Sequence, residues 1–363
     1  MDRQNSITLR SFTNLLAAGA LLRHKGEWLL VEGPFSPVKN ANNPGISIFW
    51  PDFYDLENAP LLQGTQAYRL ATSELVAICE SYLQHDTTSS EGPLRKSAWR
   101  EPLKEHFQIA LESMLQKIQR KEIQKAVPVI FARSEQTPSA RDLVQMILQL
   151  TKAPDTLYIF GCWKDGEGVL GATPETLFDF QDGILKTMAL AGTCPKSESS
   201  QRESLLNDPK EMQEHLLVVE DLKNRLAQWG DVQVTKPGIL ELPTLYHLKS
   251  DFVVRCQGTP DFLTLAKELH PTPALGVAPL SAGYKWMAQY PGQEERRGYG
   301  APFAFFSNNE ALCLVAIRNL QWNKHESMIG SGCGVVAASE LEREWRELFQ
   351  KRLSVKKILG LEL

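Results

Sequence analysis

The stretch KEMQEHLLVVEDL (210–222) constrains the fold most, because it directs acids toward the protein interior. Residues three or four apart share one face of a helix. Glu211 and Glu214 therefore lie on the same stripe as the apolar Val218 and Leu222. A buried carboxylate is costly unless a cation or hydrogen bonds compensate it, so the fold must supply partners at this helix.

The start of this helix offers a simpler role for one of the two acids. Asp208 is a candidate N-cap, Pro209 suits the first turn, and Glu211 would complete a D-x-x-E capping box. We therefore predict a helix over 209–229 and leave open whether Glu211 only caps it. Glu214 lies one turn deeper and has no capping role, and the alternative for it is a solvated surface acid.

A second acidic helix is predicted over 339–353, beginning SELEREWRELFQK. Its apolar stripe is formed by Leu341, Trp345 and Leu348. The adjacent face carries Glu340, Glu344, Glu347 and Lys351. Alone, this pattern is typical of a salt-bridged surface helix.

Together, the two helices allow a metal site built from four carboxylates. The candidate ligands are Glu211, Glu214, Glu344 and Glu347. Four acids around one cavity repel one another unless a cation neutralises them. Oxygen ligands without sulfur favour Mg²⁺, which leaves positions open for the oxygens of an anionic substrate.

The bulk composition excludes several classes of protein. With 363 residues, a net charge of -4 and a pI of about 6.0, the chain has no long basic stripe, so we expect no nucleic-acid partner. Its apolar runs are shorter than the ~20 residues that span a membrane, and we expect no membrane association. Its first residues lack the apolar core of a secretion signal. Six cysteines form no CxxC pair, which indicates reduced, mostly buried thiols in a cytoplasmic protein.

Strand-like stretches recur along the chain, with helical patterns between them. Strands are predicted at 20–33 (a hairpin turning at Lys25-Gly26), 126–133, 156–163, 184–192 and 311–322. Further helices are predicted at 107–118, 139–151 and 260–269, and a surface connection at 85–101. This pattern predicts an α/β or α+β fold with a large, mostly antiparallel sheet system. The glycine-rich GSGCGVV (330–336) lacks the GxGxxG spacing of a dinucleotide-binding turn.

Ten short motifs, taken in order, resemble those of the chorismate-utilising enzymes, which include anthranilate, aminodeoxychorismate, isochorismate and salicylate synthases. The motifs are KAVPVIFAR, GATPETLF, ALAGT, DPKEMQEH, HLKSDF, LHPTPALG, RRGYGAP, VAIR, GSGCGVV and SELEREWRELFQK. The resemblance implies the anthranilate synthase component I-like fold, with two large sheets packed face to face, helices outside and the active site in the cleft between them. Residues 98–363 would form the chorismate-binding catalytic domain, and residues 1–90, which match weakly, would complete the scaffold.

The resemblance also assigns expected roles to individual residues. Glu214 and Glu347 would be direct ligands of Mg²⁺, which holds a carboxylate of chorismate, with Glu211 and Glu344 beside them, partly through water. The residues expected to bind substrate are Thr193, His247, Tyr299, Arg318, Gly332, Gly334 and Lys351. Gly330 is interpreted as a turn residue.

Two positions are expected to carry the chemistry. Glu175, in GATPETLF, matches the general acid that protonates the departing 4-hydroxyl, so its pKa should be raised. Lys125, which opens KAVPVIFAR, matches the lysine of the water-using members, although three extra residues and Pro128 alter the local pattern. The alternative for Lys125 is an exposed residue between helix and strand. Ala191, in ALAGT, excludes the covalent attack made by a lysine at that position in aminodeoxychorismate synthases.

These features predict the Mg²⁺-dependent isomerisation of chorismate to isochorismate, in which water adds at ring carbon 2 while the 4-hydroxyl leaves. The alternatives are a salicylate synthase, which also expels pyruvate, an ammonia-using anthranilate or aminodeoxychorismate synthase component, and a catalytically idle relative. The expected partner is chorismate, without an obligate glutaminase subunit; the oligomeric state is left open, a monomer being one option. The pathway that receives the product, menaquinone or siderophore synthesis, is left open.

Overall fold

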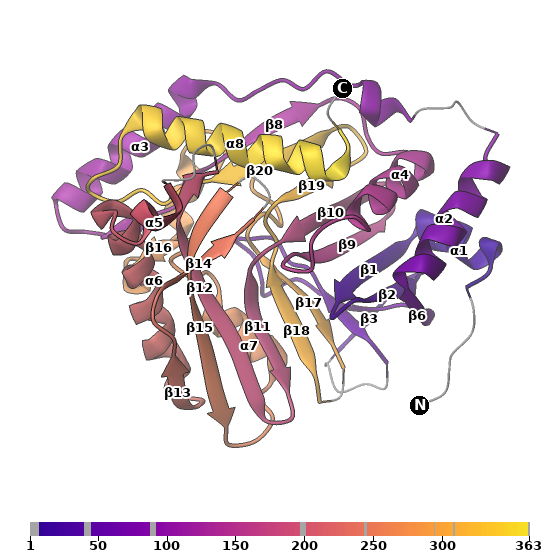
Figure 1. Ribbon diagram of the computed structural model, residues 1–363, viewed down its shortest axis with the longest axis horizontal. Coiled ribbons are helices and arrows are strands. Elements are labelled where there is room, and N and C mark those ends of the chain that lie inside the picture. Colours follow the sequence, from indigo (N-terminus) through magenta and orange to yellow (C-terminus); the bar gives the residue numbers. More distant parts are fainter. Residues whose placement is uncertain are drawn as a thin grey trace.

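The computed structural model describes residues 7–39, 45–87, 92–196, 201–242, 245–293, 295–307 and 309–361. They form two large sheets covered by helices, and the strand pairings among these residues are antiparallel (Figure 1). This confirms the predicted fold class.

The first sheet has eight strands within the described residues, in the order β6-β2-β1-β9-β10-β19-β20-β8. Its strands are β1 (Gly19–His24), β2 (Glu27–Glu32), β6 (Gln66–Ala71), β8 (Val129–Ser134), β9 (Tyr158–Lys164), β10 (Glu167–Thr173), β19 (Asn319–Trp322) and β20 (Ser327–Gly332). The predicted hairpin is confirmed, since β1 and β2 turn at Lys25 and Gly26, whose φ angles are 52° and 80°.

The second sheet has ten strands among the described residues, in the order β13-β15-β12-β11-β18-β17-β4-β5-β3, with β14 also beside β15. Its strands are β3 (Ser36–Val38), β4 (Ser47–Phe49), β5 (Leu61–Gln63), β11 (Thr176–Gln181), β12 (Ile184–Pro195), β13 (Gly230–Val234), β14 (Gly238–Glu241), β15 (Leu245–Cys256), β17 (Pro302–Phe306) and β18 (Ala311–Val315). A short separate pair joins β7 (Lys125–Ala126) to β16 (Val277–Ala278). Strands from the first 90 residues contribute to both large sheets.

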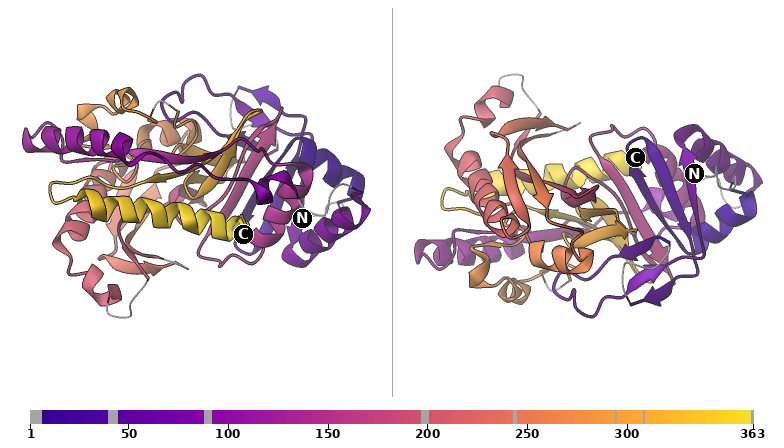
Figure 2. Two further views of the ribbon diagram at one scale, coloured as in Figure 1. Left: turned by 90° about the horizontal axis from the view of Figure 1, so that it is seen from above. Right: turned by 90° about the horizontal axis from the view of Figure 1, so that it is seen from below.

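Helices cover the outer faces of the sheets. They are α1 (Leu9–Ala17), α2 (Thr72–His85), α3 (Lys104–Gln119), α4 (Ala140–Leu150), α5 (Gln201–Leu205), α6 (Pro209–Leu226), α7 (Phe262–Leu269) and α8 (Leu341–Leu359). Three 3₁₀ turns occur at η1 (Pro93–Lys96), η2 (Leu280–Ala282) and η3 (Lys285–Gln289). Figure 2 shows α3 beside α8, and the rings of Phe107 and Trp345 meet there with centroids 5.9 Å apart. None of the helices in the described part of the chain combines the length and apolarity that a bilayer span requires.

Two segments cross from one sheet to the other side by side, and they position the centre of the molecule. The first links β10 to β11 through Glu175, and the second links β18 to β19 through Arg318. The backbone N–H of Ala172 donates to Arg318 O, and that of Val315 donates to Glu175 O, both at 3.1 Å. These bonds hold the two crossing segments against each other, so that Glu175 and Arg318 both lie where the sheets meet.

The crossing at Arg318 corrects the prediction of a single strand over 311–322. The structure divides this stretch into β18 and β19, which belong to different sheets. Arg318 has a φ of 54°, in the left-handed region that non-glycine residues seldom adopt, and this breaks the strand. The stretch predicted as a strand at 126–133 is similarly divided into β7 and β8 around Pro128, which has no N–H to donate to a ladder.

Other predictions hold with shifted ends. The C-terminal helix continues past 353 to Leu359 and ends at Gly360, whose φ of 68° is typical of a helix C-terminus. Gly330 is not in a turn, as interpreted above, but in β20, where a Cβ would lie 2.6 Å from the ring of Tyr299. All six cysteines are free and four of them are buried, as predicted. Of the predicted connection at 85–101, residues 88–91 lie outside the described part of the chain.

Candidate active site

A cavity of about 50 Å³ lies where the two crossing segments meet, and we call it the inner cavity. Most of the predicted site residues line it: Glu175, Thr193, Glu214, His247, Tyr299, Arg318, Gly332, Gly334 and Lys351. The other predicted residues stand outside this lining: Lys125, Glu211, Glu344 and Glu347. Lys125, Glu211 and Glu347 each contact a lining residue, and Glu344 is paired with Lys210, which also contacts Glu211.

Helix α6 directs its acids inward, as its apolar stripe predicts. Asp208 caps the helix by accepting bonds from the backbone N–H groups of Lys210 (2.9 Å) and Glu211 (3.1 Å). Glu211 is 1% exposed, and its Oε2 accepts from the backbone N–H of Thr193 at 2.8 Å. Its carboxylate is therefore engaged with β12 rather than with the N-cap backbone, and a role in capping alone is wrong. Burial, with help from the charge of Glu214, raises the pKa of Glu211 to about 7.

Glu214 forms a buried ion pair with Lys125 at the edge of the inner cavity. Lys125 Nζ lies 3.1 Å from Glu214 Oε1, and Lys125 is fully buried, so the alternative of an exposed lysine is wrong. Burial raises the pKa of Glu214, but the charges of Lys125 and Lys210 outweigh this effect and lower it overall. A Cβ at Gly334 would lie 2.1 Å from Glu214 Oε1, so this pair requires a glycine there.

Helix α8 supplies the facing acids. Glu344 is fully buried beside Leu348, and Glu347 forms an ion pair with Lys351 at 2.6 Å. Lys351 also donates to Gly332 O at 2.8 Å. Burial, and next the charge of Glu347, raise the pKa of Glu344. The surface-helix alternative is wrong for these residues, although it describes Glu340, which is exposed.

Two cations that the sequence reasoning missed complete the acid cluster. Lys210 is 5% exposed, and its Nζ lies 3.1 Å from Glu211 Oε1 and 2.8 Å from Glu344 Oε1. Burial lowers the pKa of Lys210, but the surrounding carboxylates outweigh it and raise the pKa above its usual value. Arg343 of α8 donates to both Asp208 and Glu211 at 2.8 Å. Lys210 could have been identified from the sequence, because it lies within the DPKEMQEH motif next to acids on a buried stripe.

The donor chemistry of this cluster fits a hard divalent cation. All the candidate ligands are carboxylates, which Mg²⁺ prefers. Glu344 Oε2 is buried without a hydrogen-bond partner, and Oε1 has only the ion pair with Lys210. Across the described ranges, no three acidic, histidine or cysteine side chains are gathered closely enough to form a ready-made metal cluster. Holding a cation therefore requires some of the lysine–carboxylate pairs to part.

The part of the lining contributed by the two crossing segments combines a protonated acid with a cation. Glu175 is 3% exposed, and burial raises its pKa to about 8 against the opposing charges of Lys125, Lys351 and Arg318. The shift has the direction expected of a general acid, because the carboxyl keeps its proton at neutral pH.

Arg318 is held by hydroxyl and imidazole groups. Its NH1 donates to Ser354 Oγ at 2.7 Å, and its NH2 lies 3.3 Å from His247 Nε2. Burial, with the charges of Arg318 and Lys351, lowers the pKa of His247 well below its usual value, so the ring is neutral. Nε2 therefore accepts from Arg318, and Nδ1–H donates to Thr193 Oγ1 at 2.9 Å.

The arrangement can bind an anionic molecule and protonate a leaving group on it. Arg318 and Lys351 offer positive charge to the inner cavity, and Glu175 offers a proton. Tyr299 forms a buried wall, packed edge-on against Phe131 with ring centroids 5.8 Å apart.

Comparisons with known proteins show a family match and a shared fold. The family described as chorismate binding enzyme matches residues 34–357. Over 241 residues the chain is 30% identical to a Pseudomonas aeruginosa protein named "Salicylate biosynthesis isochorismate synthase", a match covering 64% of this chain and 50% of that protein. It is 28% identical over 344 residues to "Isochorismate synthase MenF" of Escherichia coli, covering 88% of this chain and 78% of that protein. The solved structure of MenF from Escherichia coli superposes with a TM-score of 0.78 at 19% identity, over 98% of this chain and 92% of that one.

Proposed function

The chain belongs to the chorismate-binding enzyme family, and we propose that it is an isochorismate synthase that converts chorismate to isochorismate. The observation that carries this proposal is the composition of the inner cavity and its edge. A buried lysine, Lys125, and a protonated acid, Glu175, are both held there. Ala191 lines the cavity where a nucleophilic lysine would stand in an aminodeoxychorismate synthase.

In the proposed reaction, Arg318 and Lys351 bind substrate carboxylates, and the neutral His247 keeps the Arg318 guanidinium oriented. Glu175 donates its proton to the 4-hydroxyl, which leaves as water. Lys125 takes a proton from the water that adds at ring carbon 2. Atoms balance, because one water is added and one is lost.

We further propose that the acids of α6 and α8 hold Mg²⁺. Glu214 and Glu347 would be the direct ligands, with Glu211 and Glu344 beside them. When bound, the ion would neutralise these acids and grip a substrate carboxylate. Glu214 would then contact the ion as well as Lys125, whose Nζ lies 3.1 Å from Glu214 Oε1.

Product analysis tests this function directly. The purified protein is incubated with chorismate and Mg²⁺, and the products are separated by liquid chromatography. Isochorismate alone supports the proposal. Salicylate with pyruvate would indicate a salicylate synthase, turnover only with ammonia would indicate an aminating enzyme, and no turnover would indicate a catalytically idle relative.

A further inference from the structure

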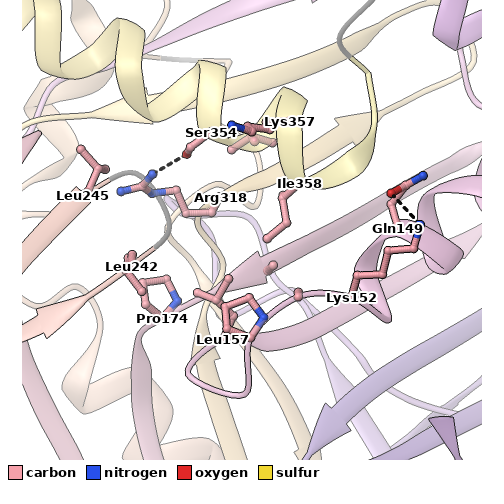
Figure 3. Close-up of a pocket in the computed structure, with 14 residues that line it drawn as sticks. Gln149, Lys152, Leu157, Pro174, Leu242, Leu245, Arg318, Ser354, Lys357 and Ile358 are labelled. Carbon is pink, nitrogen blue, oxygen red and sulfur yellow. Dashed lines mark hydrogen bonds between the residues drawn. The ribbon is translucent and has the colours of Figure 1, made fainter. Parts of the chain in front are cut away.

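A second cavity lies on the other side of Arg318, and we call it the outer cavity (Figure 3). Its volume is about 250 Å³, compared with about 50 Å³ for the inner cavity. Arg318 and Pro174 line both cavities, so they form the partition between them. The remaining walls come from the last turns of α8, the end of α4 with the residues that follow it, and Leu242 and Leu245.

The inner cavity is too small for its proposed substrate in this conformation. A cavity needs roughly 10–15 Å³ on this scale to hold one water molecule, so about 50 Å³ accommodates only a few waters. A ring with two carboxylates needs more space, and it must reach the inner cavity from an adjoining open volume. The outer cavity adjoins it directly at Arg318.

The lining of the outer cavity matches a carboxylated ring. Its walls are mostly apolar, with Leu157 and Ile358 pointing into it in Figure 3. Its rim carries the exposed Lys152 and Lys357. The described residues that line it include no aspartate or glutamate, so its charges favour an anion.

One hydrogen bond joins the Arg318 side of the partition to α8. Arg318 NH1 donates to Ser354 Oγ, which is only half-buried, at 2.7 Å (Figure 3). Within the described part of the chain, no carboxylate lies within ion-pair distance of Arg318. An incoming carboxylate therefore offers the guanidinium a stronger, charge-assisted partner than the hydroxyl it leaves.

We propose that the outer cavity is an entry chamber, in which the anionic ring docks before Arg318 releases Ser354 and admits it to the inner cavity. This inference rests on the proposed function, since it takes chorismate as the anionic ring. It assigns Lys152 and Lys357 to substrate capture, and it makes Arg318 the shared contact of the docked and the reacting positions.

A plug introduced after folding tests the chamber. Gln149→Cys places a thiol on the wall of the outer cavity, and the folded variant is then labelled with a bulky maleimide. Labelled native protein is the control, because Cys194 and Cys256 are only half-buried. We expect the label to lower kcat/KM for chorismate at least tenfold relative to unlabelled variant. Unchanged kcat/KM in the labelled variant would overturn the proposal.

Protection of the new thiol separates this inference from the proposed function. Chorismate, added as the probe, should slow the labelling of Gln149→Cys severalfold whether or not it is turned over. If native protein converts chorismate but chorismate gives no protection, the chamber is wrong and the function stands. If protection occurs without turnover, the function is wrong and the chamber stands.

Charge reversal at the rim provides a second test. Lys357→Glu, in the last turn of α8, should lower kcat/KM about threefold to tenfold at low salt with kcat unchanged, and the loss should shrink at high salt. The matched control is Lys223→Glu, an exposed lysine in the last turn of α6 that does not line the cavity. Equal effects of the two substitutions would contradict a role for Lys357 in capture.

Discussion

The two walls of the inner cavity differ in how their charged groups are paired. On the acid wall, formed by the carboxylates of α6 and α8, each candidate metal ligand already has a lysine partner. On the crossing wall, formed by Glu175, His247 and Arg318, the acid is protonated, the imidazole is neutral and the arginine has no carboxylate partner in the described chain.

This difference indicates how each wall would work. The crossing wall is prepared for an anion before any ligand arrives, because its cation is bound only to neutral groups. The acid wall already pairs its four carboxylates with three lysines, so it must exchange lysine partners for a metal ion. Metal binding should therefore rearrange the acid wall, whereas substrate entry requires the crossing wall only to exchange the Ser354 hydrogen bond of Arg318 for a substrate carboxylate.

Removing the proton donor of the crossing wall should have the largest effect. Glu175→Gln is expected to lower kcat by about 10²- to 10⁴-fold with little change in KM, because general acid catalysis contributes roughly that much. The raised pKa of about 8 means that native Glu175 is protonated below that pH, so native kcat should fall as pH rises through it. A kcat profile from pH 6 to 10 measures this. A variant that keeps the same alkaline decline would show that another group causes it.

Loss of Lys210, the cation inside the acid wall, should lower the stability of the protein. Lys210→Met leaves Glu211 and Glu344 without their shared partner, and breaking a buried ion pair typically costs about 3–5 kcal/mol of unfolding free energy. Because Mg²⁺ would replace the missing charge, we expect it to restore part of the loss in urea unfolding experiments. Lys223→Met, at an exposed position of the same helix, is the control. An identical loss with and without Mg²⁺ would argue against a cation site there.

Replacing Arg318 by another cation should weaken substrate binding at the crossing wall moderately. Arg318→Lys keeps the positive charge but loses the paired contacts to Ser354 and His247. A hydrogen bond to a charged group is worth about 1.5–3 kcal/mol, so loss of one of the two contacts that an arginine can make to a substrate carboxylate should raise KM roughly 10- to 100-fold. Steady-state kinetics would measure it, with Arg346→Lys, an exposed position of α8, as the control. A native-like KM would mean that Arg318 contributes only its charge.

The sequence predicts the acid wall better than the crossing wall, and the reason is physical. The inward stripe of α6 follows from residue spacing along one helix, so Glu214, Val218 and Leu222 could be placed without the rest of the fold. The break in the strand at Arg318 depends on the β10–β11 segment that crosses beside it. The sequence of residues 311–322 contains no signal for that contact.

The lysine partners show the same limit. Lys210 adjoins Glu211 in the chain, but its contact with Glu344 depends on how α8 packs against α6. Gly330 was misinterpreted for a related reason, because the ring that excludes a side chain there belongs to Tyr299, which is distant in sequence. Pairings within one element could be predicted, whereas pairings between elements needed the folded chain.

Calorimetric titration of Mg²⁺ into the protein, with saturating chorismate present, tests the central claim most directly. We expect one bound ion for the native protein. We expect the affinity for Mg²⁺ to be lowered at least about tenfold in Glu214→Gln and in Glu347→Gln, since loss of groups that support a metal typically costs 10- to 100-fold. Native affinity in both variants would contradict the assignment of the acid wall as a cation site.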